Sequence, residues 1–275
     1  MLRKKKIFDN FFKLISKIEL QYPKNPFGTR PLASNQKYLE LFNEIKDEKY
    51  PAIDNFEKEC SFKIDKEWLD QLALITQITI KKSKLNYQHG RILYSKLREY
   101  LNENDFKDET INIIETGTSK GFSSICLSKA LNDSNQKGKI ITFDLLPHNK
   151  KMIWNSIIDQ DNLKSRNELL QNWQEEIKNI IFIQGFSTVF LKRVHIDRCH
   201  FAFLDAEHTL AEVMNEFNYI KNKQKSGDII IFDDVTPNQF DGVVQAIKEI
   251  EKQNLYVFNI IMSSDKRGYA IAKRK

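Results

Sequence analysis

The chain has 275 residues, of which 41% are hydrophobic and 29% charged, with only nine glycines and six prolines. This composition excludes a disordered or collagen-like chain and predicts a globular protein with a packed core. The formal net charge is +6 at pH 7, but the lysines are spread along the chain and mixed with 37 acidic residues, which favours a solvated surface and argues against a nucleic-acid partner.

The N-terminal segment MLRKKKIFDNFFKLISKIEL begins with a basic run, as signal peptides do. Polar residues at Asp9, Asn10 and Lys13 interrupt the apolar stretch that a signal peptide needs. We therefore predict an amphipathic helix that docks on its own domain or on a second copy of the chain, with contact to a membrane surface as the less favoured alternative. No apolar run approaches the ~20 residues of a membrane-spanning helix, so we expect no transmembrane segment.

The first part of the chain shows apolar residues at helical spacing and no convincing strand, and its last helix is expected at 86–101. We predict that residues 1–105 form a helical cap or oligomerisation region and that residues 106–275 form an α/β domain. The three cysteines are far apart and lie in apolar contexts, so we expect reduced, buried thiols in a cytoplasmic protein. They are Cys60, Cys126 and Cys199.

From residue 111 onward, apolar β-rich segments alternate with helical ones, which is typical of a parallel sheet covered by helices on both faces. The last two strands are joined only by SSDKR, which is too short for a crossover helix, so they should pair antiparallel. Residues 145–178 exceed a simple crossover and should form a helical insertion near the site. The predicted strands lie near 111–116, 139–143, 180–184, 200–204, 228–232, 255–261 and 268–273.

The segment ETGTSKG, residues 115–121, joins the first strand to a helix. Gly117 permits a tight turn and close approach of a ligand to the backbone, and Gly121 lets the helix start close to the sheet. A dinucleotide motif G-x-G-x-x-G would need glycines where the chain has Ser119 and Phe122, and a P-loop would need glycine at 122 followed by lysine. The remaining pattern, E-x-G-x-x-x-G, resembles the first motif of the class I S-adenosylmethionine-dependent methyltransferases.

The strand pattern strengthens this resemblance, because five parallel strands closed by an antiparallel hairpin resemble the seven-stranded, doubly wound, Rossmann-like sheet of that family. Asp144 ends the second strand, where an acidic side chain can accept both hydroxyls of a ribose; helix capping is the alternative. The resemblance implies that S-adenosyl-L-methionine is the cofactor. The residues that it implicates in cofactor binding are Glu115, Gly117, Thr118, Ser119, Gly121, Asp144, Gly185, Phe186 and Ser187.

Acidic residues also follow the fourth and fifth strands, Asp205 after HFAFL and the pair Asp233 and Asp234 after DIIIF. We expect these strands to be neighbours, so the three carboxylates would repel one another unless a cation neutralised them. Oxygen ligands favour a hard divalent cation, Mg²⁺ first and Mn²⁺ or Ca²⁺ as alternatives. His208 lies three residues after Asp205 and could accept a proton from a substrate hydroxyl. Capping by the aspartates and a surface role for His208 remain alternatives.

The segments LDAEHTLAEV and GDIIIFDDV resemble a narrower branch, the metal-dependent sugar O-methyltransferases. This resemblance implies methyl transfer to a hydroxyl of a sugar, a glycan precursor or another small polyhydroxylated molecule. It also implies that His208 and Asp205 are catalytic and that Asp205, Asp233 and Asp234 bind the metal. A binding or scaffold protein with a degenerate methyltransferase fold and an NAD-dependent oxidoreductase are the alternatives. The intact loop argues against the first, and the missing glycines and the acidic triad argue against the second.

The other four histidines are expected to be structural. His89 and His148 could border the site, whereas His195 and His200 flank a turn and belong to the scaffold. The family resemblance covers about residues 85–275. The preceding 80 residues are therefore expected to influence the choice of acceptor.

Overall fold

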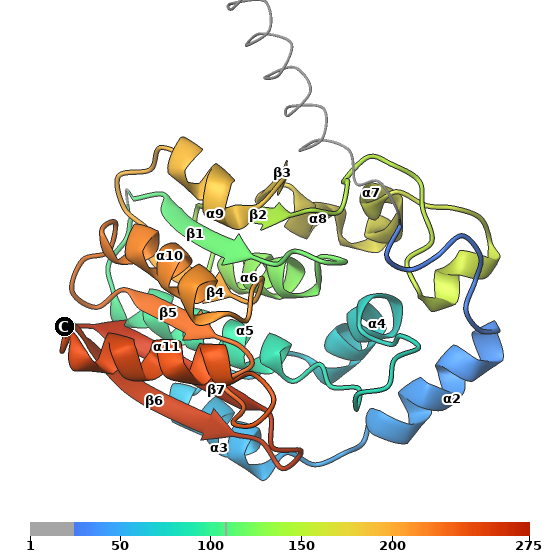
Figure 1. Ribbon diagram of the computed structural model, residues 1–275, viewed down its shortest axis with the longest axis horizontal. Coiled ribbons are helices and arrows are strands. Elements are labelled where there is room, and N and C mark those ends of the chain that lie inside the picture. Colours follow the sequence, from blue (N-terminus) through green and yellow to red (C-terminus); the bar gives the residue numbers. More distant parts are fainter. Residues whose placement is uncertain (1–24, 108) are drawn as a thin grey trace, which may run out of the picture.

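The computed structural model describes residues 25–107 and 109–275 (Figure 1). The amphipathic helix predicted at the N-terminus, with its docking partner, lies outside the described residues. Seven strands form one sheet in the order β3-β2-β1-β4-β5-β7-β6. Their bounds are β1 Ile111–Thr116, β2 Gly138–Asp144, β3 Ile180–Gln184, β4 Phe201–Leu204, β5 Ile229–Phe232, β6 Tyr256–Met262 and β7 Gly268–Arg274.

The direction of each strand agrees with the sequence prediction. Strands β1 to β5 pair in parallel, and β7 is antiparallel to both β5 and β6. The predicted fold class, a mostly parallel methyltransferase-like sheet with an antiparallel C-terminal hairpin, is confirmed. The strand order reverses between β1 and β4, and open α/β sheets bind ligands at the carboxyl ends of the strands beside such a point.

Apolar side chains alternate between the two faces of the sheet. On β1, Ile113 packs into one hydrophobic cluster and Ile114 into the other, and on β5 Ile229 and Ile230 divide in the same way. Helices cover both faces, so every residue of β4 and β5 is buried. One face is covered by α5 His89–Glu103 and α6 Phe122–Asp133, and the other by α10 Leu210–Lys221 and α11 Asp241–Lys252.

Residues 25–107 contain helices and loops. Side-chain caps begin two of the helices: Ser34 accepts a hydrogen bond from the Lys37 amide, and Asp65 accepts one from the Trp68 amide. The helices share one hydrophobic cluster with the sheet, so this region is packed onto the α/β domain. Figure 1 shows α2 and α4 on the side toward which the arrow of β1 points. Besides α5, the helices are α2 Asn35–Ile45, α3 Pro51–Cys60 and α4 Lys66–Thr76.

The insertion at residues 145–178 contains short helical turns, η1 Ile157–Gln160, α7 Arg166–Leu169, η2 Gln171–Trp173 and α8 Gln174–Ile177. Asn155 connects this insertion to the N-terminal helices, because its Oδ1 accepts hydrogen bonds from the Tyr38 hydroxyl at 3.0 Å and from the Ile80 amide at 2.9 Å. After β3 come α9 Ser187–Phe190 and η3 Leu191–Arg193.

Cys60, Cys126 and Cys199 are all buried and free of disulfides, as the sequence predicts. Desolvation raises the pKa of each thiol, so these cysteines behave as small apolar core residues and not as nucleophiles. Among the described residues, no helix combines the length and the hydropathy that crossing a bilayer requires.

Candidate functional site

The turn after β1 packs directly against the end of β4. Gly117 has φ +90°, and a Cβ atom there would lie 2.3 Å from the carbonyl oxygen of Asp205. Its amide donates a hydrogen bond to the Phe143 carbonyl on β2 at 2.9 Å. Only glycine satisfies both the left-handed backbone and this close approach. The glycine that the sequence suggested for contact with a ligand therefore also sets the spacing between two strand ends.

Glu115 lies beneath this turn and is fully buried. Its carboxylate accepts hydrogen bonds from Ser123 and Ser124 on α6 and from Thr142 on β2. Burial raises the pKa of Glu115, and the three hydroxyl donors oppose that shift. The side chain thus joins a strand to a helix from below the loop.

Asp144 stands at the end of β2 and orders the two loops beside it. Its carboxylate accepts hydrogen bonds from the Ser119 amide at 2.5 Å and from the Leu146 amide at 2.6 Å. Desolvation raises its pKa, while the nearby charge of Arg166 lowers it. Each carboxylate oxygen keeps acceptor capacity for a further donor, such as a ribose hydroxyl.

Arg166, in the insertion, supports the same two loops from behind, and sequence reasoning missed it. Its Nε donates to the Ser119 carbonyl at 2.9 Å and its Nη2 to the Leu146 carbonyl at 3.3 Å. The guanidinium lies 5.6 Å from the ring centres of both Trp154 and Phe182. An arginine in a polar stretch carries no signal of such burial, because the contacts come from segments far away in the sequence.

A cleft of about 350 Å³ opens at the carboxyl ends of β1 to β4. It brings together most of the predicted cofactor residues and one predicted metal ligand, Asp205. Thr118, Gly121 and Glu115 do not line it; they shape the loop behind it. The lining residues that the sequence predicted are Gly117, Ser119, Asp144, Gly185, Phe186, Ser187 and Asp205, and those that it missed are Pro26, Phe27, Phe143, Leu145, Leu146, Ala206 and Glu207.

Glu216 on α10 is a buried carboxyl group under the cleft that sequence reasoning also missed. It accepts hydrogen bonds from the Thr116 hydroxyl at the end of β1, at 3.0 Å, and from the Ser187 hydroxyl at the start of α9. Only 1% of the residue is exposed, and desolvation raises its pKa to about 7. The end of β1 and the start of α9 are thus joined through one titratable group.

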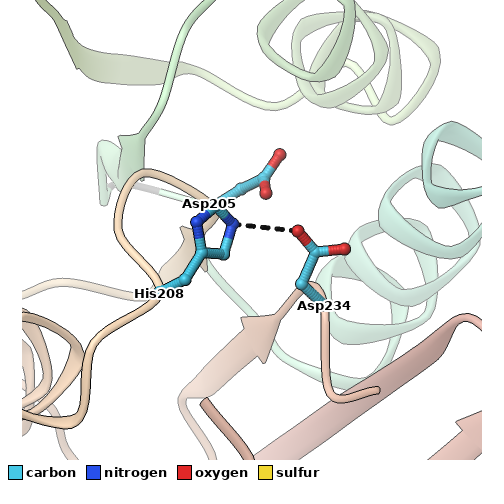
Figure 2. Close-up of side chains that lie close together, drawn as sticks. All are labelled: Asp205, His208 and Asp234. Carbon is cyan, nitrogen blue, oxygen red and sulfur yellow. Dashed lines mark hydrogen bonds and ion pairs between the residues drawn. The ribbon is translucent and has the colours of Figure 1, made fainter. Parts of the chain in front are cut away.

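Figure 2 shows the side chains of Asp205, His208 and Asp234 pointing toward one another. One potential ligand atom from each lies within 4.8 Å of the others. The Nε2 atom of His208 is 2.9 Å from Oδ2 of Asp234, and this hydrogen bond raises the pKa of the imidazole. The imidazole also stacks on Phe240, with 4.6 Å between ring centres.

Asp233 does not join this group. The Nε atom of Arg267 donates to its Oδ1 at 3.0 Å, and the Nη2 atom donates to its Oδ2. The guanidinium charge lowers the pKa of Asp233 against the effect of burial. Arg267 comes from the turn between β6 and β7, which sequence reasoning had considered only as a connection. Desolvation, together with the charge of Asp233, raises the pKa of Asp205.

The remaining histidines lie apart from this group. His89 is packed between Phe122 and Phe203, and burial lowers its pKa to about 3. His148 stacks on Phe182 at 4.1 Å between ring centres, and its pKa falls to about 4. His200 is hydrogen-bonded to Glu109 and to the Asn112 amide, and His195 is exposed.

Residues 114–235 match the family model described as a methyltransferase domain. The fold is similar to that of the O-methyltransferase TomG from Streptomyces achromogenes, solved with SAM, at 16% identity and a TM-score of 0.52, over 78% of this chain and 92% of that one. It is also similar to an O-methyltransferase from Bacillus cereus in complex with SAH, at 15% identity and a TM-score of 0.50, over 86% and 96%. The cofactor-bound protein Rv0187 from MTB gives 15% identity and a TM-score of 0.54, over 77% and 90%. No curated protein matches the chain in sequence.

Proposed function

We propose that this chain is a class I S-adenosylmethionine-dependent methyltransferase and that it transfers the methyl group to a hydroxyl of a small polyhydroxylated acceptor such as a sugar or glycan precursor. The observation that carries O-methylation is the group Asp205, His208 and Asp234 beside the cleft. Asp205 belongs both to this group and to the lining of the cleft. Two of the structures with a similar fold are named O-methyltransferases, which agrees with this proposal.

S-Adenosylmethionine supplies a methyl group on a sulfonium centre. In this proposal Asp144 accepts the ribose hydroxyls, because its carboxylate ends β2 and is already fixed by two amides. The backbone at Gly117 and Ser119 lies along the methionine portion, and Gly185 to Ser187 lie beside the adenine. The ring of Phe186, a residue 46% exposed, offers an apolar surface there.

His208 is proposed as the general base. The Asp234 carboxylate accepts a hydrogen bond from Nε2–H of His208. This leaves Nδ1 with a lone pair that can take the proton of the acceptor hydroxyl. The hydroxyl oxygen forms the new bond to the methyl carbon as the carbon–sulfur bond breaks, and the proton moves to His208. The products are the methyl ether and S-adenosylhomocysteine. Asp234 then stabilises the imidazolium, which agrees with the raised pKa of His208.

A divalent cation fits the same group of side chains. We propose that Asp205 and Asp234 hold it, since potential ligand atoms of both residues lie within 4.8 Å of each other and of His208. Asp233, which the sequence pattern included, is instead neutralised by Arg267. A bound cation of the Mg²⁺ type would supply a Lewis acid that lowers the pKa of the acceptor hydroxyl.

The proposal is tested by incubating the protein with S-adenosylmethionine, Mg²⁺ and a panel of sugars and other polyols, with methylated products detected by mass spectrometry. We expect His208→Gln to slow turnover by roughly 10²- to 10⁴-fold, the usual contribution of a general base. His195→Gln is the matched control, because His195 is an exposed histidine outside the site. Tight binding of S-adenosylhomocysteine without methyl transfer to any hydroxylated acceptor would instead support the binding or scaffold alternative.

A further inference from the structure

We propose that Arg267 is a positioning residue that decides which of two adjacent aspartates, Asp233 or Asp234, faces His208. The inference rests on the proposed roles of His208 and Asp234. Both aspartates directly follow β5, so the backbone conformation at this point decides which of the two side chains faces the site. Arg267 fixes that choice by binding one of them.

The guanidinium holds Asp233 at two points, through Nε at 3.0 Å and through Nη2. A planar fork of this kind fixes the orientation of a carboxylate as well as its charge. The Asp233 side chain is fully buried and its Oδ1 also accepts the Asp234 amide at 2.7 Å. Asp234 then adopts a left-handed backbone with φ +56°, and its Oδ2 comes to lie 2.9 Å from His208.

Arg267 is itself held in place by the turn that carries it. The Asp265 carboxylate accepts the Asn86 amide side chain at 2.5 Å and the Arg267 amide at 3.3 Å. Beyond Arg267, the Gly268 amide donates to the Thr236 hydroxyl at 3.1 Å, and the Val235 amide donates to the Gly268 carbonyl at 2.9 Å. The turn is thus attached both to the loop before α5 and to the segment after Asp234.

The contacts of the Arg267 guanidinium explain how one positive charge can distinguish Asp233 from Asp234. The Nε atom of Arg267 also lies 3.5 Å from Oδ1 of Asp234, so the guanidinium attracts both carboxylates. Asp233 is bound at two points and Asp234 at one, which leaves Oδ2 of Asp234 for His208. If Asp233 lost its charge, Arg267 would turn toward Asp234 and draw it from His208.

The test compares Arg267→Gln and Asp233→Asn with the wild type by two-bond ¹H–¹⁵N spectra of the histidine rings, which report the hydrogen bond at Nε2 of His208. Both variants are expected to lose the hydrogen-bonded Nε2 signature and to bind S-adenosylhomocysteine within about twofold of wild type. Arg267→Lys keeps the positive charge but loses the two-point hydrogen bonding of the guanidinium, and it should give a His208 Nε2 signal between those of the wild type and Arg267→Gln. Lys266→Gln is the matched control, because it removes an exposed charge from the same turn and should change nothing.

Arg267→Gln leaves Asp233 as a buried, unpaired charge, so a failure to fold would not by itself inform about positioning. Asp233→Asn avoids this problem, because Arg267 can still pair with Asp234 and no buried charge is left without a partner. A wild-type signature retained in Asp233→Asn, or absent from the wild type itself, overturns the positioning role. Lack of methyl transfer by the wild type, with the signature lost as expected in the variants, would contradict the proposed function and leave the positioning role supported.

Discussion

The proposed cofactor side of the site, at the ends of β1, β2 and β3, is held largely by backbone groups, whereas the acidic side, at the ends of β4 and β5, is held by charged side chains. On the cofactor side Asp144 binds two main-chain amides, and Gly117 touches a main-chain carbonyl. On the acidic side the partners are His208 for Asp234 and Arg267 for Asp233. The first side should therefore respond most to changes of backbone conformation, and the second to changes of charge.

Gly117→Ala should give the largest effect on ligand binding, because Gly117 is where the two sides touch. The added Cβ would lie 2.3 Å from the Asp205 carbonyl. A displacement of that loop should weaken S-adenosylhomocysteine binding on the order of 100-fold, measured by calorimetry. The strained backbone should also lower the free energy of unfolding by about 1–3 kcal/mol.

Gly227→Ala provides the matched control for that substitution. Gly227 has a similar φ of +92°, but no heavy atom lies within 4 Å of the position that an added Cβ would take. Gly227→Ala should lower the free energy of unfolding through backbone strain, and its affinity for S-adenosylhomocysteine should equal that of the wild type. Equal losses of affinity in the two variants would contradict the view that contact with the Asp205 carbonyl, just after β4, is what makes Gly117 necessary.

Asp234→Asn should affect the acidic side alone. Mn²⁺ affinity, measured by electron paramagnetic resonance, should fall at least about 10-fold, since the variant loses a charged ligand and its bond to His208. The affinity for S-adenosylhomocysteine should stay within about twofold of wild type, because Asp234 does not line the cleft. A parallel loss of both affinities would show that the two sides are not independent.

The substitution Glu216→Gln should produce the smallest effect. It tests whether the charge of a buried side chain beneath the cofactor side also affects stability. Burial raises its pKa from 4.5 to about 7, so the native state binds a proton more tightly than the unfolded state does. The free energy of unfolding should therefore fall as the pH rises from about 4.5 to 7, by this group's contribution. Glu216→Gln should flatten that part of the curve in urea denaturation experiments.

Glu251→Gln serves as the control for the pH experiment, because Glu251 is exposed on α11. It should leave the dependence on pH as in the wild type. A curve for Glu216→Gln that keeps the wild-type slope between pH 4.5 and 7 would contradict a buried, titrating Glu216.

The same contrast explains how much of the molecule could be predicted from the sequence. The strands were predictable because β-branched runs and turn residues are local signals: β1 lies at 111–116, as expected, and β7 pairs antiparallel with β6. Asp144 and Gly117 line the cleft, and this could be predicted because each lies at or just after the end of a strand. The positions of these residues are set by the sequence next to them in the chain.

The acidic side was less predictable because its geometry depends on distant residues. The pattern D-x-x-H correctly suggested that Asp205 and His208 lie close together, but the choice between Asp233 and Asp234 depends on Arg267, 34 residues beyond Asp233. Arg166 and Glu216 were missed for the same reason. Glu115 lies in the motif, yet its two oxygens are used by neighbouring hydroxyls, which no spacing rule reveals.

The central claim is that the cleft at the ends of β1 to β4 binds the methyl donor through Asp144. Isothermal titration of the wild type and of Asp144→Ala with S-adenosylhomocysteine, and of the wild type with NAD, tests it most directly. We expect the wild type to bind S-adenosylhomocysteine and not NAD, and Asp144→Ala to bind at least about 10-fold more weakly, since two loops and the ribose lose their acceptor. Binding of NAD without S-adenosylhomocysteine, or equal affinity in the variant, would contradict the account.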